Sequence, residues 1–374
     1  MINTGVWPGW GGDDSAHARL LWAADGVEVN KPCDYPCKFV HGDPAVYHDA
    51  DAVVVETVNH PKFGHDGKPM PWPVGNQQTH TPLVGAFGLE PVEAYPRYQP
   101  TSPEMAAHAS FSMSYLPTST LPVSLMCPWG LPPASPAAAA VFGELAASYL
   151  HPVSAQSVPS NGAIAFFSDR GISSDTWSLL QRLAQVAGAK LHTFVGPGGL
   201  RKQAVPADIP NALAHLPDRL RLIKRYRAVL VAQSSKTPDW LEPEVSHALV
   251  AGAVPVVWGP PNLADLMPSR HAALDATKFG NDVDSLWAAI QRIVSDDAEF
   301  DGWQMWRSEA ALAAAAVAPT AHEQSLRRAT LETRLPPNSA ATDFARFGRN
   351  LVDTCAHYAE CRICKHVHST LASA

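Results

Sequence analysis

Apolar and polar positions follow a regular order through the second half of the chain. Short apolar runs, typical of buried strands, occur at residues 163–168, 190–196, 226–232 and 253–259. Segments with apolar residues at helical spacing separate or follow these runs, at residues 176–188, 244–252 and 284–295. Ser174 and Asp175 are candidate N-caps for the first helix, and Gly188 and Gly252 can end two of the helices. This alternation predicts βαβ units around a parallel sheet.

Residues 1–127 show a weaker pattern. The segments 49–57 and 82–90 are interpreted as buried parallel strands that end in polar residues. A stretch rich in proline, alanine and serine follows near residues 128–162, with a candidate short helix at 141–150, and is interpreted as an insertion plus an interdomain linker. The pattern therefore predicts an α/β fold with two Rossmann-like domains facing a cleft. A small-molecule or nucleotide site is expected at the carboxyl ends of the strands.

Composition narrows the functional classes. An apolar fraction of 46% with only 17% charged residues excludes a disordered polyelectrolyte. The net charge of −7, from 28 basic and 35 acidic residues, excludes a basic nucleic-acid surface. The 34 prolines predict long irregular connections and argue against an all-helical bundle. No apolar run has the ~20 residues of a membrane span, and the first residues lack the pattern of a signal peptide.

Five segments, in consistent order along the chain, resemble the α1,3/4-fucosyltransferase family. The longest is YRAVLVAQSSKTPDWLEPEVSHALVAGAVPVVWGPP, which is similar to that family's YKF-x-L-x-FENS-xxx-DYVTEK-xx-NAL-x-AG-x-VPVV-x-GPP without a gap. The others are LVGAFGLEPVEAYP, SMSYLPTSTLPV, ADLMPSRHAALDATKF and the tail CRICKHV. Together they are spread over most of the chain between residues 49 and 367.

The resemblance implies a GT-B fold. Residues 1–155 would form the acceptor-side domain, residues 162–345 the nucleotide-sugar domain, and residues 346–374 a tail with a Cys-x-x-Cys motif. It implies an inverting transfer of L-fucose from GDP-fucose to a hydroxyl of a glycan or glycoprotein, typically O3 of N-acetylglucosamine. No tightly bound metal is implied, and a divalent cation (Mn or Mg) on the diphosphate is left open. The implied location is the Golgi lumen, with membrane attachment only through an anchor that this sequence does not show.

The catalytic base implied by the resemblance is Glu90, because the acceptor hydroxyl must lose a proton to a carboxylate. From the residues alone, an N-cap or a surface acid before Pro91 is the preferred interpretation of Glu90, and Glu93 is its nearest rival as the base. Tyr115 stands where the family has a tyrosine near the donor. The alternative for Tyr115 is a core aromatic.

Ser168 and Asp169 end the first strand of the second half, where the family contacts the donor. The alternative is an ordinary turn. The family's diphosphate-binding arginine corresponds to Ser174 or Asp175, so Arg170 is the candidate replacement. The loop at 196–202, GPGGLRK, is interpreted as a turn rather than a phosphate site.

The segment similar to DYVTEK departs most from the family. Pro243 replaces the glutamate that holds fucose, Glu244 replaces the lysine that neutralises the diphosphate, and Gln233 replaces another glutamate. The donor-binding candidates here are Ser234, Ser235, Asp239, Trp240, Glu242 and Glu244. These replacements favour two alternatives: a weakened or inactive fucosyltransferase-like binding protein, or a transferase with a different sugar nucleotide. We expect Glu244→Lys to tighten GDP binding.

The six cysteines gather mainly near the two ends of the chain. Their even number and grouping favour an oxidising compartment. A zinc site from Cys361, Cys364 and nearby histidines is an alternative, but a terminal disulfide is preferred. By resemblance to secretory enzymes, Cys361 and Cys364 are expected to be oxidised. Cys33 and Cys37 are expected to pair together or each with another cysteine.

Overall fold

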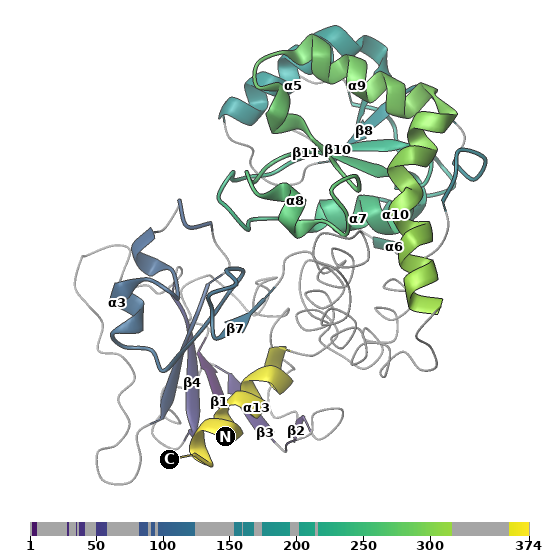
Figure 1. Ribbon diagram of the computed structural model, residues 1–374. Coiled ribbons are helices and arrows are strands. Elements are labelled where there is room, and N and C mark those ends of the chain that lie inside the picture. The colour runs from purple at the N-terminus through teal and green to yellow at the C-terminus, as the bar shows by residue number, and fades with distance from the viewer. Residues whose placement is uncertain are drawn as a thin grey trace. The chain divides into compact units, whose positions relative to one another are not determined.

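The computed structural model describes residues 2–5, 28–29, 35, 37–41, 50–57, 82–88, 91–93, 96–123, 153–158, 160–167, 174–194, 202–213, 216–315 and 359–373. These residues form two compact units, each with its own sheet (Figure 1). The described residues up to 123, together with 359–373, make the first unit, and residues 153–315 make the second. The candidate helix at 141–150 lies outside the described residues.

The second unit is built on a parallel five-stranded sheet. Its strands are β8 (Ile164–Phe166), β9 (Leu191–Thr193), β10 (Ala228–Ala232), β11 (Val254–Trp258) and β12 (Leu274–Asp275). Their order is β12-β11-β10-β8-β9, and every neighbouring pair is parallel. Every residue of β8, β10 and β11 is buried, as expected for parallel strands covered on both faces. The strands predicted from the apolar runs are therefore confirmed.

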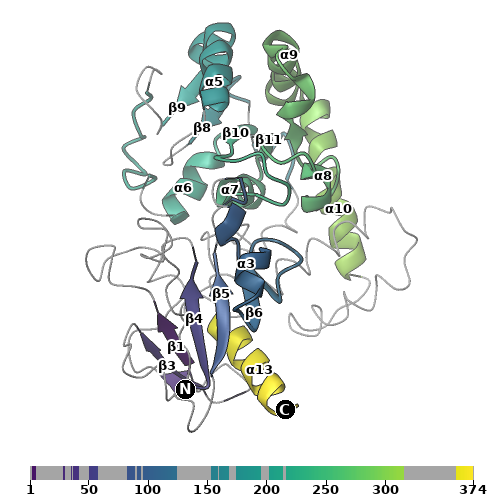
Figure 2. The same cartoon turned by 90° about the vertical axis from the view of Figure 1, so that its left-hand side faces the viewer.

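Helices cover both faces of this sheet. Figures 1 and 2 show α5 (Ser174–Ala187) and α9 (Val283–Ser295) on one face, and α6 (Leu216–Ile223), α7 (Pro243–Ala251) and α8 (Leu263–Leu266) on the other. The chain continues from α9 into α10 (Asp297–Ala315). The core under α5 and α9 includes Leu180, Leu183, Ile290 and alternate residues of the strands. The unit is thus a doubly wound α/β fold.

Two glycines end helices where the sequence predicts it. Gly252 follows α7 with a φ of 86°, and its N–H donates to the carbonyls of Ala248 and Leu249. This left-handed C-cap suits glycine, because it carries no Cβ. Gly188, with a φ of 56°, follows α5 and begins the short 3₁₀ helix Gly188–Lys190.

The first unit has a seven-stranded sheet in the order β2-β3-β1-β4-β5-β6-β7. The strands are β1 (Ile2–Gly5), β2 (Glu28–Val29), β3 (Cys37–His41), β4 (Ala52–Glu56), β5 (Leu83–Phe87), β6 (Phe111–Ser114) and β7 (Leu121–Pro122). All neighbouring pairs are parallel except β2 and β3. The helical turn Pro96–Tyr98 and the short helix α3 (Pro103–Ala106) lie between β5 and β6. The predicted α/β class with two Rossmann-like units is confirmed, while a cleft between them stays a prediction.

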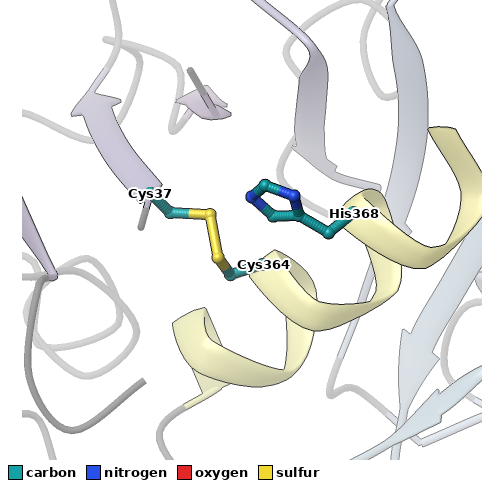
Figure 3. A group of neighbouring side chains, drawn as sticks. All are labelled: Cys37, Cys364 and His368. Carbon is teal, nitrogen blue, oxygen red and sulfur yellow. A yellow bond between two sulfur atoms is a disulfide. The ribbon is translucent and has the colours of Figure 1, made fainter. Parts of the chain in front are cut away.

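The last helix of the chain, α13 (Ala359–Leu371), belongs to the first unit. A disulfide joins Cys364 of α13 to Cys37 at the start of β3 (Figure 3). On the same helix, Arg362 Nη1 donates to the carbonyl of Pro122 at 2.6 Å. The described part of the predicted tail 346–374 is therefore packed against the N-terminal sheet.

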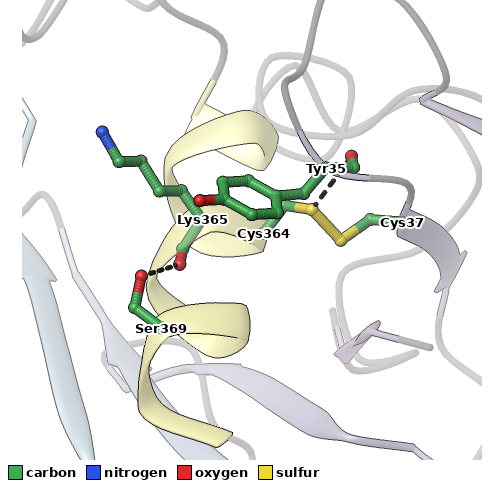
Figure 4. The surroundings of a disulfide bond; sticks show 5 residues. All are labelled: Tyr35, Cys37, Cys364, Lys365 and Ser369. Atoms are coloured by element: carbon green, nitrogen blue, oxygen red, sulfur yellow. Dashed lines mark hydrogen bonds between the residues drawn. A yellow bond between two sulfur atoms is a disulfide. The ribbon is translucent and has the colours of Figure 1, made fainter. Parts of the chain in front are cut away.

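Aromatic side chains surround this disulfide. The ring of Tyr35 lies beside it (Figure 4). The same ring stacks on His368, with 5.0 Å between the ring centroids. His366 packs on Phe111 at 4.9 Å, and burial lowers the pKa of its imidazole. His366 is therefore a largely neutral packing side chain at pH 7.

The cysteine predictions are confirmed in part and corrected in part. Cys364 is oxidised, and Cys37 is joined to another cysteine, which is one of the two alternatives. A disulfide between Cys361 and Cys364 is wrong, because Cys364 pairs with Cys37. Zinc binding by Cys364 is disfavoured for the same reason. Sulfur atoms of Cys37 and Cys364 lie within 4.8 Å of a His368 ring nitrogen, but bonded to each other they offer no thiolate.

We expect Cys37→Ser and Cys364→Ser each to lower the free energy of unfolding of the first unit by about 2–4 kcal/mol, because the disulfide closes a long loop. The double variant should lose no more than either single variant, since both remove one bond. Urea unfolding without reductant measures this. Ser369→Ala is the control, because it removes only a bond to the Lys365 carbonyl on the exposed side of α13. Single variants as stable as the parent would contradict the structural role.

Candidate functional site

The order of the strands in the second unit selects one place for a ligand. β8 and β10 are neighbours, but the chain leaves β8 toward β9 and leaves β10 toward β11, on opposite sides. In doubly wound sheets a crevice opens at the carboxyl ends of the two strands where this direction reverses. Residues 233–242 follow β10 there. Ser168, Asp169 and Arg170 follow β8 in the sequence and lie outside the described residues.

Glu242 connects the end of β10 to the start of α7. It occupies the N-cap position of α7, but its side chain makes no bond to the helix. Instead, its Oε1 accepts hydrogen bonds from the hydroxyl of Ser234 and from the Ser234 N–H at 3.2 Å. Glu242 is only 4% exposed. One oxygen of this carboxylate is thus occupied inside the protein, and Glu242 and Ser234 hold each other in place.

Gln233 lies at the same junction and is 1% exposed. Its Oε1 accepts a hydrogen bond of 2.6 Å from the N–H of Glu242, while its Nε2 is buried without a partner among the described residues. A Cβ at Gly259 would approach the Gln233 Cγ to 2.6 Å, closer than real contacts allow. Glycine at 259 therefore makes room for the Gln233 side chain.

Asp239 adopts a left-handed backbone conformation, with a φ of 67°. Two reciprocal bonds hold it: its N–H donates to Asn262 Oδ1 at 3.0 Å, and Asn262 Nδ2 donates to Asp239 Oδ1 at 2.8 Å. Trp240, the next residue, is 2% exposed. This stretch is therefore fixed against the segment that precedes α8.

The remaining donor-side candidates differ in accessibility. The hydroxyls of Ser235 and Thr237 are hydrogen-bonded at 2.7 Å. Glu244 lies half-buried in the first turn of α7. The structure thus brings Ser234, Glu242 and Ser235 together at the junction of β10 and α7.

Sequence reasoning missed Lys236, Trp258, Gly259 and Asn262. Lys236 Nζ lies 4.7 Å from the ring centroid of Trp258 and 3.7 Å from Asp175 Oδ2. A basic residue directly after β10, in the loop at the reversal point, was the available signal for Lys236. The partners come from distant segments and carry no local signal.

Candidates in the first unit are only partly described. Tyr115 is 7% exposed, and its hydroxyl accepts a hydrogen bond of 3.0 Å from the N–H of Val92. Tyr115 therefore holds the segment that follows Glu90. Glu90 itself lies outside the described residues, and Glu93 is exposed.

Comparison with known proteins identifies the second unit. Residues 208–334 match the family model "Glycosyltransferase family 10 (fucosyltransferase) C-term". These residues are therefore similar to the carboxyl-terminal part of fucosyltransferases of that family, and the match includes β10, α7 and the loop between them.

Curated relatives are distant. A human GDP-fucose protein O-fucosyltransferase 3 is 27% identical over 29% of this chain and 22% of its own length. An Arabidopsis thaliana alpha-(1,4)-fucosyltransferase is 29% identical over 26% of this chain and 24% of its own length. The chain thus matches less than a quarter of the length of either relative. A crystal structure of an alpha1,3-fucosyltransferase with GDP-fucose covers 81% of this chain and 80% of that chain, with 11% identity and a TM-score of 0.46.

We expect Glu242→Ala and Ser234→Ala to be non-additive in their effect on stability. Glu242→Ala should lower the free energy of unfolding of the second unit by about 1–3 kcal/mol, because the partly buried hydroxyl and N–H of Ser234 lose their acceptor. Once Glu242 is gone, Ser234→Ala should add little. Denaturant unfolding of the four proteins of this cycle measures the coupling. Asp284→Ala, an exposed carboxylate in the first turn of α9, is the control with a smaller expected loss. Additive losses would contradict the contact.

Proposed function

We propose that the protein is an inverting fucosyltransferase that moves L-fucose from GDP-fucose to a hydroxyl of a glycan or glycoprotein, typically O3 of N-acetylglucosamine. One observation carries the proposal: the family 10 match covers the residues that border the reversal point of the second sheet. The two relatives named above differ in the acceptors that their names give, so the acceptor rests on the family resemblance alone.

The proposed reaction needs one base and one leaving group. The carboxylate of Glu90 takes the proton of the acceptor hydroxyl, whose oxygen forms a bond to C1 of fucose. The bond between C1 and the diphosphate oxygen breaks, GDP leaves with the electron pair, and the configuration at C1 inverts. Ser168, Asp169 and Arg170 remain the proposed donor contacts after β8, and the loop 233–244 supplies those after β10. Tyr115 positions the segment beyond Glu90.

A weakened or purely binding relative is the second candidate. The first turn of α7 places Pro243 and Glu244 where the family has glutamate and lysine, and Glu242 uses one of its oxygens for Ser234. A carboxylate close to a diphosphate opposes its binding. A divalent cation, Mn or Mg, would relieve this repulsion. We propose the Golgi lumen as the location by family resemblance. No helix within the described residues has the length and apolar character of a membrane span.

Calorimetry of the purified chain with GDP-fucose, GDP and UDP tests the proposal, with and without Mn²⁺. We expect GDP and GDP-fucose to bind and UDP to bind at least about tenfold more weakly, a difference of about 1.4 kcal/mol. Binding of GDP-fucose without fucose transfer to any acceptor glycan would favour the second candidate. Equal binding of UDP and GDP, or no binding of GDP, would overturn the donor assignment.

Glu90→Gln should lower turnover by about a hundredfold or more, the usual scale for a general base. The affinity for GDP should stay within about twofold, because the base contacts the acceptor and not the nucleotide. Glu93→Gln is the matched control, since Glu93 is an exposed carboxylate in the same segment. Steady-state transfer assays and GDP titrations measure both quantities. A comparable loss in Glu93→Gln with an active Glu90→Gln would move the assignment.

A further inference from the structure

Lys236 is the one basic residue in the loop 233–242 that follows β10. The same loop and the first turns beside it carry several carboxylates, those of Asp175, Asp239, Glu242 and Glu244. Of these, Asp239 accepts a bond from Asn262 and Glu242 accepts bonds from Ser234. Among the described residues of this loop, Lys236 therefore carries the positive charge.

The contacts of Lys236 come from both sides of the reversal point. Its ammonium lies over the indole of Trp258, the last residue of β11, at 4.7 Å. It also lies 3.7 Å from Asp175 in the first turn of α5, the helix that follows β8. The aromatic ring supports the side chain through a cation–π contact, which leaves the ammonium able to bind a further anion.

The contact between Lys236 and Asp175 is weak. At 3.7 Å it exceeds a hydrogen-bond distance, and the two side chains are 40% and 77% exposed. Exposed ion pairs contribute little to stability, because water solvates both partners. Lys236 can therefore exchange Asp175 for another anion at small cost.

Two buried donors at the carboxyl ends of neighbouring strands have no partner among the described residues. They are Gln233 Nε2, at the end of β10, and Trp258 Nε1, at the end of β11. The side chains of Gln233 and Trp258 are 1% and 7% exposed. An unpaired buried N–H is costly and calls for an acceptor. Of the two donors, Trp258 Nε1 belongs to the ring that contacts Lys236, and an unpaired donor beside a cation favours an anionic, oxygen-rich ligand.

We propose that Lys236 binds the diphosphate of the sugar nucleotide, and that Asp175 competes with the diphosphate for it. The chemical nature of the ligand rests on the proposed function. Lys236, near the start of the loop, would then supply the positive charge that α7 lacks, because Glu244 stands there in place of the family's lysine. In the family pattern Lys236 falls at one of the unspecified positions between FENS and DYVTEK, so the pattern does not mark it as a binding residue.

Calorimetry of Lys236→Gln with GDP and with guanosine tests this assignment. We expect GDP binding to weaken about tenfold or more, the scale of a hydrogen bond to a charged group, and guanosine binding to stay unchanged. Lys236→Arg should retain most of the GDP affinity. Lys190→Gln is the matched control, because the exposed Lys190 precedes β9 and so lies at the amino edge of the same sheet.

Asp175→Asn gives a second, opposite test. It should tighten GDP binding about two- to fivefold, the range of an exposed ion pair, and this gain should vanish in the Lys236→Gln background. A folded Lys236→Gln that binds GDP as the unmodified protein does would overturn the assignment and leave the proposed function standing. Lys236-dependent binding of ADP or UDP in preference to GDP would overturn the proposed function alone. Absence of binding to all three diphosphates would overturn both.

Discussion

The burial of β10 on both faces is the constraint on which the site depends. All five residues of Ala228–Ala232 are buried, and the strand pairs with β8 and β11 along its edges. Polar chemistry is therefore displaced to the carboxyl end, where Gln233 and Ser234 begin the loop. Because the chain leaves β8 and β10 in opposite directions, this end is also where a doubly wound sheet opens.

Hydrogen bonds determine which of the charges in this loop can act on a ligand. Glu242 and Asp239 look in the sequence like two negative charges that repel a diphosphate. In the structure each carboxylate accepts hydrogen bonds from neutral neighbouring donors, which stabilise its negative charge and hold it in place. Among the described residues, Lys236 contacts an aromatic ring and an exposed carboxylate. The proposed preference of this site for an anion therefore rests on the distribution of these partners more than on the count of charges.

The first unit depends on a contact between the two ends of the chain. The disulfide between Cys37 and Cys364 spans 327 residues in sequence and brings α13 to the N-terminal sheet. His366 on Phe111 and Arg362 on Pro122 extend this contact toward β6 and β7. The first unit, which contains Glu90, therefore needs the last helix of the chain to complete its fold. Its residues are not one continuous segment that precedes the second unit.

The sequence by itself determined β8 to β11 and the helices α5, α7 and α9 of the second unit, and the resemblance of this unit to fucosyltransferases. Apolar runs, helical spacing and Gly252 are local signals, because burial and backbone conformation act within a few residues. The strand order, the pairing of Cys37 with Cys364 and the partners of Lys236 were decided only by the tertiary structure. Trp258 and Asp175 approach Lys236 from β11 and α5, and no local pattern encodes such a meeting. Glu242 shows the same limit: its spacing allowed a ligand contact, but folding placed Ser234 against one of its oxygens.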